Sequence, residues 1–188
     1  MKLILITTLL LSMPLIADEE ALVLAPAEIE KIQSDYEKMA TEPGSVMFDP
    51  PAGWKMADPK VLSKYVKIMV VGEMTGAFPP SINLAFDPFK GTMKGYLKMV
   101  KSYNESQGAD WKDLGTITVK AGNASLSQVD TKTKWGVERQ MQVIFLKDDT
   151  AWILTCSALK DEFSKYYKDF FEAIKSLRVN ALNLNTQN

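Results

Sequence analysis

The end of the chain predicts a strand that turns directly into an amphipathic helix. Residues 151–158 read AWILTCSA, a run of apolar and β-branched side chains that is typical of a buried strand. Residues 160–178 follow without a linker and carry a wide apolar stripe at helical spacing, made by Phe163, Tyr166, Tyr167, Phe170, Ile174 and Leu177. A stripe of this width must be buried, so we expect the helix to close a layered domain by packing on a sheet.

The rest of the pattern extends this unit into a complete domain. Helical periodicity covers residues 26–40 and 92–106, and strand-like runs cover 45–49, 65–71 and 81–87. Four more strands follow between residues 114 and 158. Their short connections force neighbouring strands to run antiparallel. The sequence therefore predicts an α+β fold, a layered sandwich with a mainly antiparallel sheet of about six to seven strands covered by helices.

The later strands are joined by turn-forming residues. We expect tight turns at Gly122-Asn123, at residues 130–134 and at residues 147–149. In the strand of residues 136–146, alternation places Met141 and Val143 on one side and two glutamines, Gln140 and Gln142, on the other.

The N-terminus has the organisation of an export signal. Lys2 is followed by the apolar residues 3–16, a run shorter than the roughly 20 residues that a membrane-spanning helix needs. We expect cleavage between Ala17 and Asp18; an alternative bond follows Ala27, and a retained, buried N-terminal helix is the competing interpretation. The predicted organisation is a signal peptide (1–17), an N-terminal helical segment (18–44), a sandwich domain (45–179) and a frayed polar tail (180–188), in a protein that is exported to the periplasm or secreted.

Composition excludes several classes of function. The chain has no histidine, which removes Ser-His-Asp and Cys-His catalysis and the commonest zinc ligand. Its only cysteine, Cys156, lies in an apolar strand, where we expect a buried, inert thiol rather than a reactive one or a bond between chains. Asp148 and Asp149 fit a turn better than an acid–base pair or a metal site, although an oxygen-ligated Ca²⁺ site stays open. We therefore expect no catalytic residue, no metal site and no cofactor.

The formal net charge of −1, with dispersed lysines, is not that of a protein that binds nucleic acid. After cleavage of the signal we expect no membrane-spanning segment. The remaining classes of partner are another protein and a small molecule.

Several motifs, in this order, resemble the PsbP/Mog/DcrB group of single-domain sandwiches. They are a Pro-Pro-x-Gly-Trp turn after a short strand, a Pro-Ser-Ile-Asn strand start before a helix, and an aromatic-rich last helix ending Ile-Lys-Ser-Leu (Pro50, Pro51, Gly53, Trp54; 80–83; 93–103; 174–177). The similarity extends over about residues 45–179, and the envelope branch is closest in setting. The resemblance implies an α/β/α sandwich that acts in binding or assembly rather than catalysis.

Apolar side chains in two loops are the candidate binding site. Trp54, Phe78, Pro79 and Pro80 lie in segments where solvent exposure is expected, and exposed aromatic loops can mark a partner site. The alternative is that Trp54 and Phe78 fold back to cap one end of the sheet.

We expect an exported, soluble, non-catalytic binding or assembly factor of the bacterial cell envelope, with an unidentified envelope protein as partner. The alternative is a carrier of an apolar or amphipathic small ligand, held between the sheet and a helix near Trp54 and Phe78. A third hypothesis is an enzyme that uses only carboxylate, lysine or tyrosine side chains.

Overall fold

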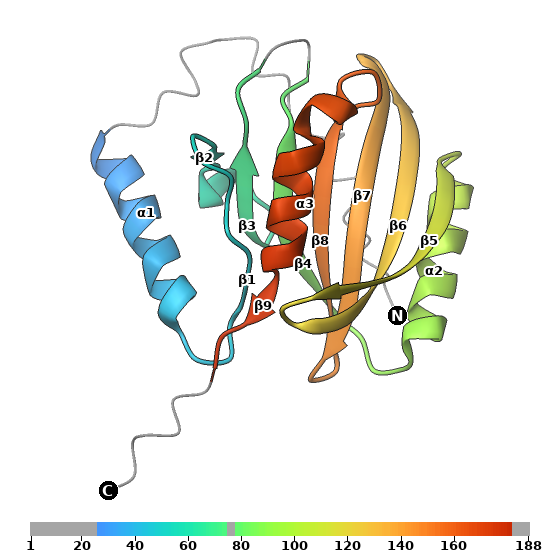
Figure 1. Ribbon diagram of the computed structural model, residues 1–188, viewed down its shortest axis with the longest axis horizontal. Coiled ribbons are helices and arrows are strands. Elements are labelled where there is room, and N and C mark those ends of the chain that lie inside the picture. Colours follow the sequence, from blue (N-terminus) through green and yellow to red (C-terminus); the bar gives the residue numbers. More distant parts are fainter. Residues whose placement is uncertain (1–25, 75–77, 182–188) are drawn as a thin grey trace, which may run out of the picture.

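A computed structural model of the chain describes residues 26–74 and 78–181, which form a main antiparallel sheet flanked by helices, together with a separate two-stranded sheet (Figure 1). The sheet has seven strands in the order β2-β3-β4-β8-β7-β6-β5, and all neighbouring pairs are antiparallel. The predicted α+β sandwich is therefore confirmed. The expected signal peptide, its cleavage site at Ala17 and Asp18, and residues 182–188 of the expected tail lie outside the described residues.

The strands are β1 (Val46–Met47), β2 (Lys55–Met56), β3 (Val66–Val71), β4 (Ser81–Pro88), β5 (Asp110–Val119), β6 (Gly122–Thr133), β7 (Gly136–Lys147), β8 (Thr150–Leu159) and β9 (Arg178–Val179). The helices are α1 (Pro26–Thr41), α2 (Met93–Ser106) and α3 (Tyr167–Ser176), with short 3₁₀ turns at Pro59–Val61 and Phe163–Tyr166. Within the described part of the chain, no helix is long and apolar enough to cross a membrane.

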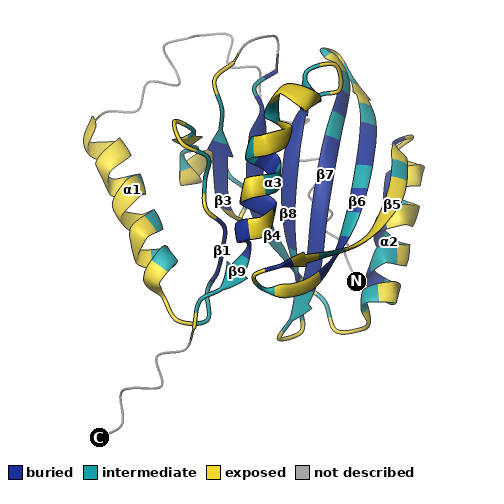
Figure 2. Ribbon diagram, viewed as in Figure 1, coloured by how far each residue is buried: buried dark blue, intermediate teal, exposed yellow. Residues whose placement is uncertain are grey.

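Two apolar clusters lie on opposite faces of the sheet. On one face, Phe170 and Ile174 of α3 pack over buried strand residues such as Leu84 and Leu154. On the other face, Tyr96 and Val100 of α2 pack against three residues of the central strands, Ile144, Ala151 and Ile153. The central strands β8 and β7 are buried over most of their length, whereas α1 is largely exposed (Figure 2).

The closing helix begins later than the sequence predicts. Residues 160–162 form a turn. The Lys160 N–H still donates to the Val137 carbonyl of β7 (2.8 Å), and the Glu162 N–H closes the turn by donating to the Leu159 carbonyl (2.9 Å). A 3₁₀ turn follows, and α3 starts only at Tyr167. The assignment of Tyr167 to the buried stripe was wrong, since its side chain is 53% exposed.

Two of the predicted turns are shifted along the chain. The β5–β6 turn lies at Lys120 and Ala121, because Gly122 and Asn123 are already paired with β5. β6 then continues through the expected turn at 130–134 as far as Thr133, so the β6–β7 turn lies at residues 134–135. An ion pair across the two strands favours this longer hairpin: Arg139 is opposite Asp130, and its Nη2 lies 2.7 Å from a carboxylate oxygen of Asp130.

The start and the end of the domain are joined. β1 pairs with β9, a contact that the sequence did not predict. The expectation that the tail is frayed from Asn180 was wrong for that residue. Its backbone N–H donates to the Ser45 carbonyl (2.9 Å), and its side-chain amide donates to the carbonyl of Ala40 at the end of α1 (2.8 Å). Tyr36 of α1 also donates to the Phe48 carbonyl (2.9 Å), which fixes the helix beside β1.

The β7–β8 turn contains the two acidic residues at which a turn was predicted, and it provides a stability test. Asp148 and Asp149 both have positive φ, 51° and 53°. Side chains in this left-handed region cost free energy that glycine does not. We expect Asp149→Gly to raise the free energy of unfolding by about 0.5 to 1 kcal/mol in urea denaturation. Asp161→Gly is the control, because Asp161 lies in an exposed turn without positive φ. If both variants lose the same amount of unfolding free energy, the left-handed conformation of Asp149 is contradicted.

Candidate functional site

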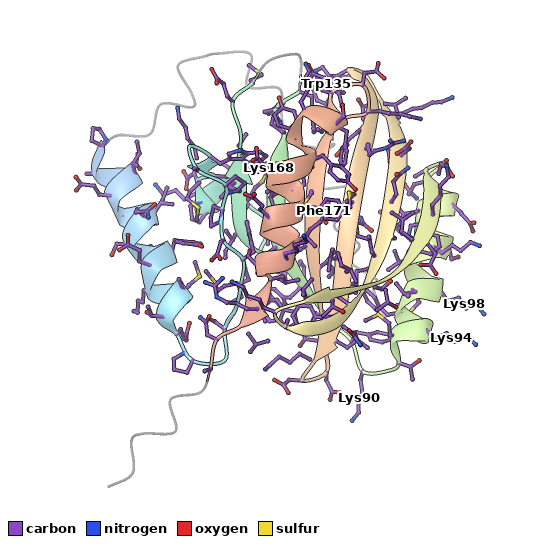
Figure 3. All side chains as sticks on the ribbon, viewed as in Figure 1. Lys90, Lys94, Lys98, Trp135, Lys168 and Phe171 are labelled. Carbon is purple, nitrogen blue, oxygen red and sulfur yellow. The ribbon has the colours of Figure 1, made fainter. Side chains whose placement is uncertain are left out.

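The residues of the predicted loop site are packed against the domain. Trp54 is half-buried, with its ring edge-on to Tyr166 (6.3 Å between centroids) and Phe170 (6.0 Å). Phe78 is 8% exposed and lies 5.7 Å from the ring of Trp135, which sits at the β6–β7 end of the sheet (Figure 3).

The structure brings part of this loop group together. Pro79 is half-buried and Pro80 is buried. A Cβ added to Gly72 would come within 2.8 Å of Pro80 and 3.0 Å of the Trp54 ring, so these two side chains meet over this glycine. Phe78 instead packs on Trp135. The role of Trp54, Phe78, Pro79 and Pro80 in binding stays a prediction.

A depression of about 410 Å³ lies beside the Pro50–Pro51 turn and the last turns of α3. Among its charged lining residues, Asp49 contacts Arg178 (2.5 Å) and Lys120 (3.8 Å), and Glu172 contacts Lys168 (3.9 Å). Trp54 is not among its lining residues. These ion pairs serve the fold, and the depression is the weaker candidate for a site.

A band of polar side chains crosses the middle of the sheet on the face opposite α3. We call it the polar stripe, and its members are at most 4% exposed: Ser81 and Asn83 of β4, Thr155 and Ser157 of β8, Glu138, Gln140 and Gln142 of β7, and Ser127 of β6. Most of their strand neighbours, on the other face, are core residues, as alternation requires. The stripe thus replaces apolar core on one half of this face.

Strand register aligns these residues into rows. Ser81 is opposite Ser157, which is opposite Gln140. In the next row Asn83 is opposite Thr155, and the row continues through Gln142 to Ser127. Positions far apart in the sequence therefore form one continuous polar surface. α2 packs on the neighbouring part of the same face, where Ile144 and Ile153 continue the strands.

A chain of hydrogen bonds runs along β7 within the stripe. Gln142 Nε2 donates to Gln140 Oε1 (3.2 Å), and Gln140 Nε2 donates to Glu138 Oε1 (2.8 Å). The Ser157 hydroxyl donates to the same carboxylate oxygen. Burial raises the pKa of the Glu138 carboxyl, and the hydrogen bonds from Ser157 and Gln140 oppose this only in part.

Three polar atoms of the stripe have no hydrogen-bond partner: Ser81 Oγ, Asn83 Oδ1 and Ser127 Oγ. Leaving a buried polar atom unsatisfied costs about 1–3 kcal/mol. These three atoms, which we call the orphan atoms, lie on both sides of the hydrogen-bonded side chains of β7: two are on β4 and one is on β6. The described residues supply no partner for these three buried atoms, so a ligand or ordered water would have to supply one.

The hydroxyls of the stripe are not arranged as histidine-activated nucleophiles. Ser157 donates to a carboxyl group rather than to a histidine, and the chain has no histidine to act as a base at neutral pH. Cys156 faces α3 and is fully buried, as predicted, and burial raises the pKa of its thiol. Across residues 26–74 and 78–181, no three acidic or cysteine side chains gather into a group that could hold a metal ion.

Sequence reasoning missed this site. It placed Gln140 and Gln142 on the face opposite Val143 but took no account of their burial. The available signal was polar residues at every second position in several strands, as in Glu138-x-Gln140-x-Gln142. A solvent-exposed face gives the same pattern.

No protein-family model and no curated protein matches the sequence. Solved structures share its fold at low sequence identity. LpqN, described as involved in cell envelope biogenesis of Mycobacterium tuberculosis, has a TM-score of 0.51 at 14% identity, over 74% of this chain and 86% of that one.

Two other structures give lower scores. PA94 of Pseudomonas aeruginosa, a protein of unknown function, has a TM-score of 0.49 at 12% identity, over 70% of this chain and 95% of its own. The cyanobacterial PsbP of Synechocystis has a TM-score of 0.47 at 15% identity, over 71% and 86%. At 14% identity, the likeness to LpqN is one of fold alone.

Proposed function

We propose that this chain is an exported, non-catalytic binding or assembly factor of a bacterial cell envelope. The observation that carries the proposal is the polar stripe, in which hydrogen-bonding groups are gathered, three of them unpaired, without an activated nucleophile beside them. The predicted export signal supports the setting. LpqN has a similar fold and a described role in cell envelope biogenesis, which is consistent with that setting.

The second candidate is a carrier of a small amphipathic ligand. The specific observation in its favour is that the stripe borders the apolar residues Ile144 and Ile153 on the same face of the sheet. Tyr96 and Val100 of α2 cover these isoleucines, so a molecule with one polar and one apolar side would contact both groups only by displacing α2 from them. Such sites combine an apolar lining with a few placed polar groups.

Native mass spectrometry of the protein purified from its own cells distinguishes the two functions. A stoichiometric protein in the complex supports the assembly factor, and a stoichiometric small molecule supports the carrier. The same preparation is tested against a broad panel of hydrolase substrates beside a heat-inactivated sample. Turnover above that control would contradict the non-catalytic assignment.

The predicted loop site has its own test. If Trp54 and Phe78 bind the partner, the double variant Trp54→Ala and Phe78→Ala should lose the co-purifying species while keeping a cooperative melting transition. Both changes also remove packing, so a destabilised control is needed. Phe163→Ala is that control, because Phe163 is 5% exposed and belongs to the core cluster. Retention of the species by both variants would rule out the loop site.

A further inference from the structure

We propose that the polar stripe binds a neutral small molecule whose polar groups are mainly hydroxyls, of the sugar or polyol class. The proposal rests on the binding function above and adds to it the site and the chemical class of the ligand. It is argued from the charge of the stripe and from its hydrogen-bonding groups.

The charge of the stripe favours a neutral ligand. Glu138 is its one ionisable member; the others are amides and hydroxyls. No lysine or arginine belongs to the stripe, so nothing within it would compensate an anionic ligand brought into a buried site. Glu138 accepts hydrogen bonds from Ser157 and Gln140 at one oxygen, so this carboxyl is already engaged with neutral donors rather than with a cation.

The hydrogen-bonding groups match hydroxyls. The free atom of Asn83 is a carbonyl oxygen, which needs a donor, whereas the free hydroxyls of Ser81 and Ser127 can donate or accept. A ligand hydroxyl also does both, so one type of group satisfies all three. Because the orphans lie on β4 and β6, with β8 and β7 between them, the ligand must carry several hydroxyls spread over its length.

The apolar residues beside the stripe are already covered by α2. Ile144 and Ile153 follow Gln142 and Thr155 at the next positions of the same face. Tyr96 and Val100 of α2 cover both side chains, which are 1% and 7% exposed, so the ligand is held by the hydrogen-bonding groups of the stripe and not by an apolar contact. Without a ligand or ordered water, the three orphan atoms stay uncompensated.

Saturation-transfer NMR with the purified mature protein tests the proposal. The probes are glucose, N-acetylglucosamine, maltose and maltotriose, with glucose 6-phosphate and glucosamine as charged counterparts of glucose. We expect signal transfer to at least one neutral probe and none to the phosphate. Transfer to none of the neutral probes, or equal transfer to the phosphate, would overturn the proposal; in the first case the orphan groups serve water only.

Variants locate the site. Ser81→Ala together with Ser127→Ala removes two orphan hydroxyls and should abolish the signal. The control is Ser125→Ala, since Ser125 is buried on the same face of β6 but is not an orphan. The double variant should melt at or above the wild-type temperature, because it removes unsatisfied groups; a folded double variant that still gives the wild-type signal would also contradict the site.

The two proposals can fail separately. If no sugar binds, the binding function still stands, and mass spectrometry can still find a co-purifying protein or another ligand. Hydrolysis of the neutral probes would instead contradict the non-catalytic function while leaving the site and its ligand class standing.

Discussion

Replacing Phe170 with alanine is expected to lower the free energy of unfolding by about 3–5 kcal/mol. Phe170 is fully buried, and its ring packs against Phe163 (5.0 Å between centroids) as well as Trp54 (6.0 Å). Its removal would leave a cavity between α3 and the sheet that this tightly packed group cannot readily fill. Urea denaturation followed by circular dichroism measures the change.

Tyr167 is the matched control for this experiment. It belongs to the same apolar stripe of the sequence and precedes Phe170 by one helical turn, yet it is 53% exposed. Tyr167→Ala should therefore change the unfolding free energy by less than about 1 kcal/mol. Similar losses of unfolding free energy from both substitutions would mean that Tyr167 is buried like Phe170, as the sequence pattern predicts and contrary to the structure.

Replacing Glu138 with glutamine is expected to change how stability depends on pH. Burial holds the pKa of Glu138 above its ordinary value, so the folded protein binds this proton more tightly than the unfolded chain does. The wild type therefore loses stability as the pH rises from the ordinary glutamate pKa through the raised one. Glu138→Gln removes this loss, and above that window we expect the variant to be more stable than the wild type by on the order of 1 kcal/mol.

The measurement is the unfolding free energy of both proteins at several pH values from acid to neutral. Asp130→Asn is a control of opposite sign, because the hydrogen bond from Arg139 lowers the pKa of Asp130. That variant should be less stable than the wild type at neutral pH, with the difference shrinking as the pH falls through the carboxyl range. Parallel pH profiles for the wild type and Glu138→Gln would contradict a buried, ionisable Glu138.

Patterns along one element were enough to predict much of the fold. The alternation of Ile82 and Leu84 identified the core face of β4, and the run around Cys156 identified a buried strand. Antiparallel pairing followed from short connections. These features depend on neighbouring residues, and the sequence contains that information directly.

Features set by contacts between distant residues were missed. The β5–β6 turn moved because Gly122 pairs with Val119, and Asn180 is ordered only because α1 and β1 supply its partners. β1 and β9 are two residues each, too short for a periodic signal.

The candidate site was missed for a related reason. Nothing in the local pattern separates a buried polar face from an exposed one, since Ser81, Asn83, Gln140 and Gln142 alternate with core residues in either case. Only the strand order and register bring these side chains into adjacent rows. The loop site, by contrast, was proposed from the expected exposure of Trp54 and Phe78, and the structure packs both rings against the domain.

The central claim is that the polar stripe binds a ligand, and the side-chain amides of the stripe report on it directly. Asn83, Gln140 and Gln142 each give NH₂ signals in ¹H–¹⁵N spectra of the mature protein, and they can be followed during titration with whichever neutral saccharide gives saturation transfer. The account predicts that these three pairs of signals shift together and saturate, and that Ser81→Ala with Ser127→Ala abolishes the shifts. Shifts confined to residues outside the stripe, or no shifts with any neutral probe, would contradict it.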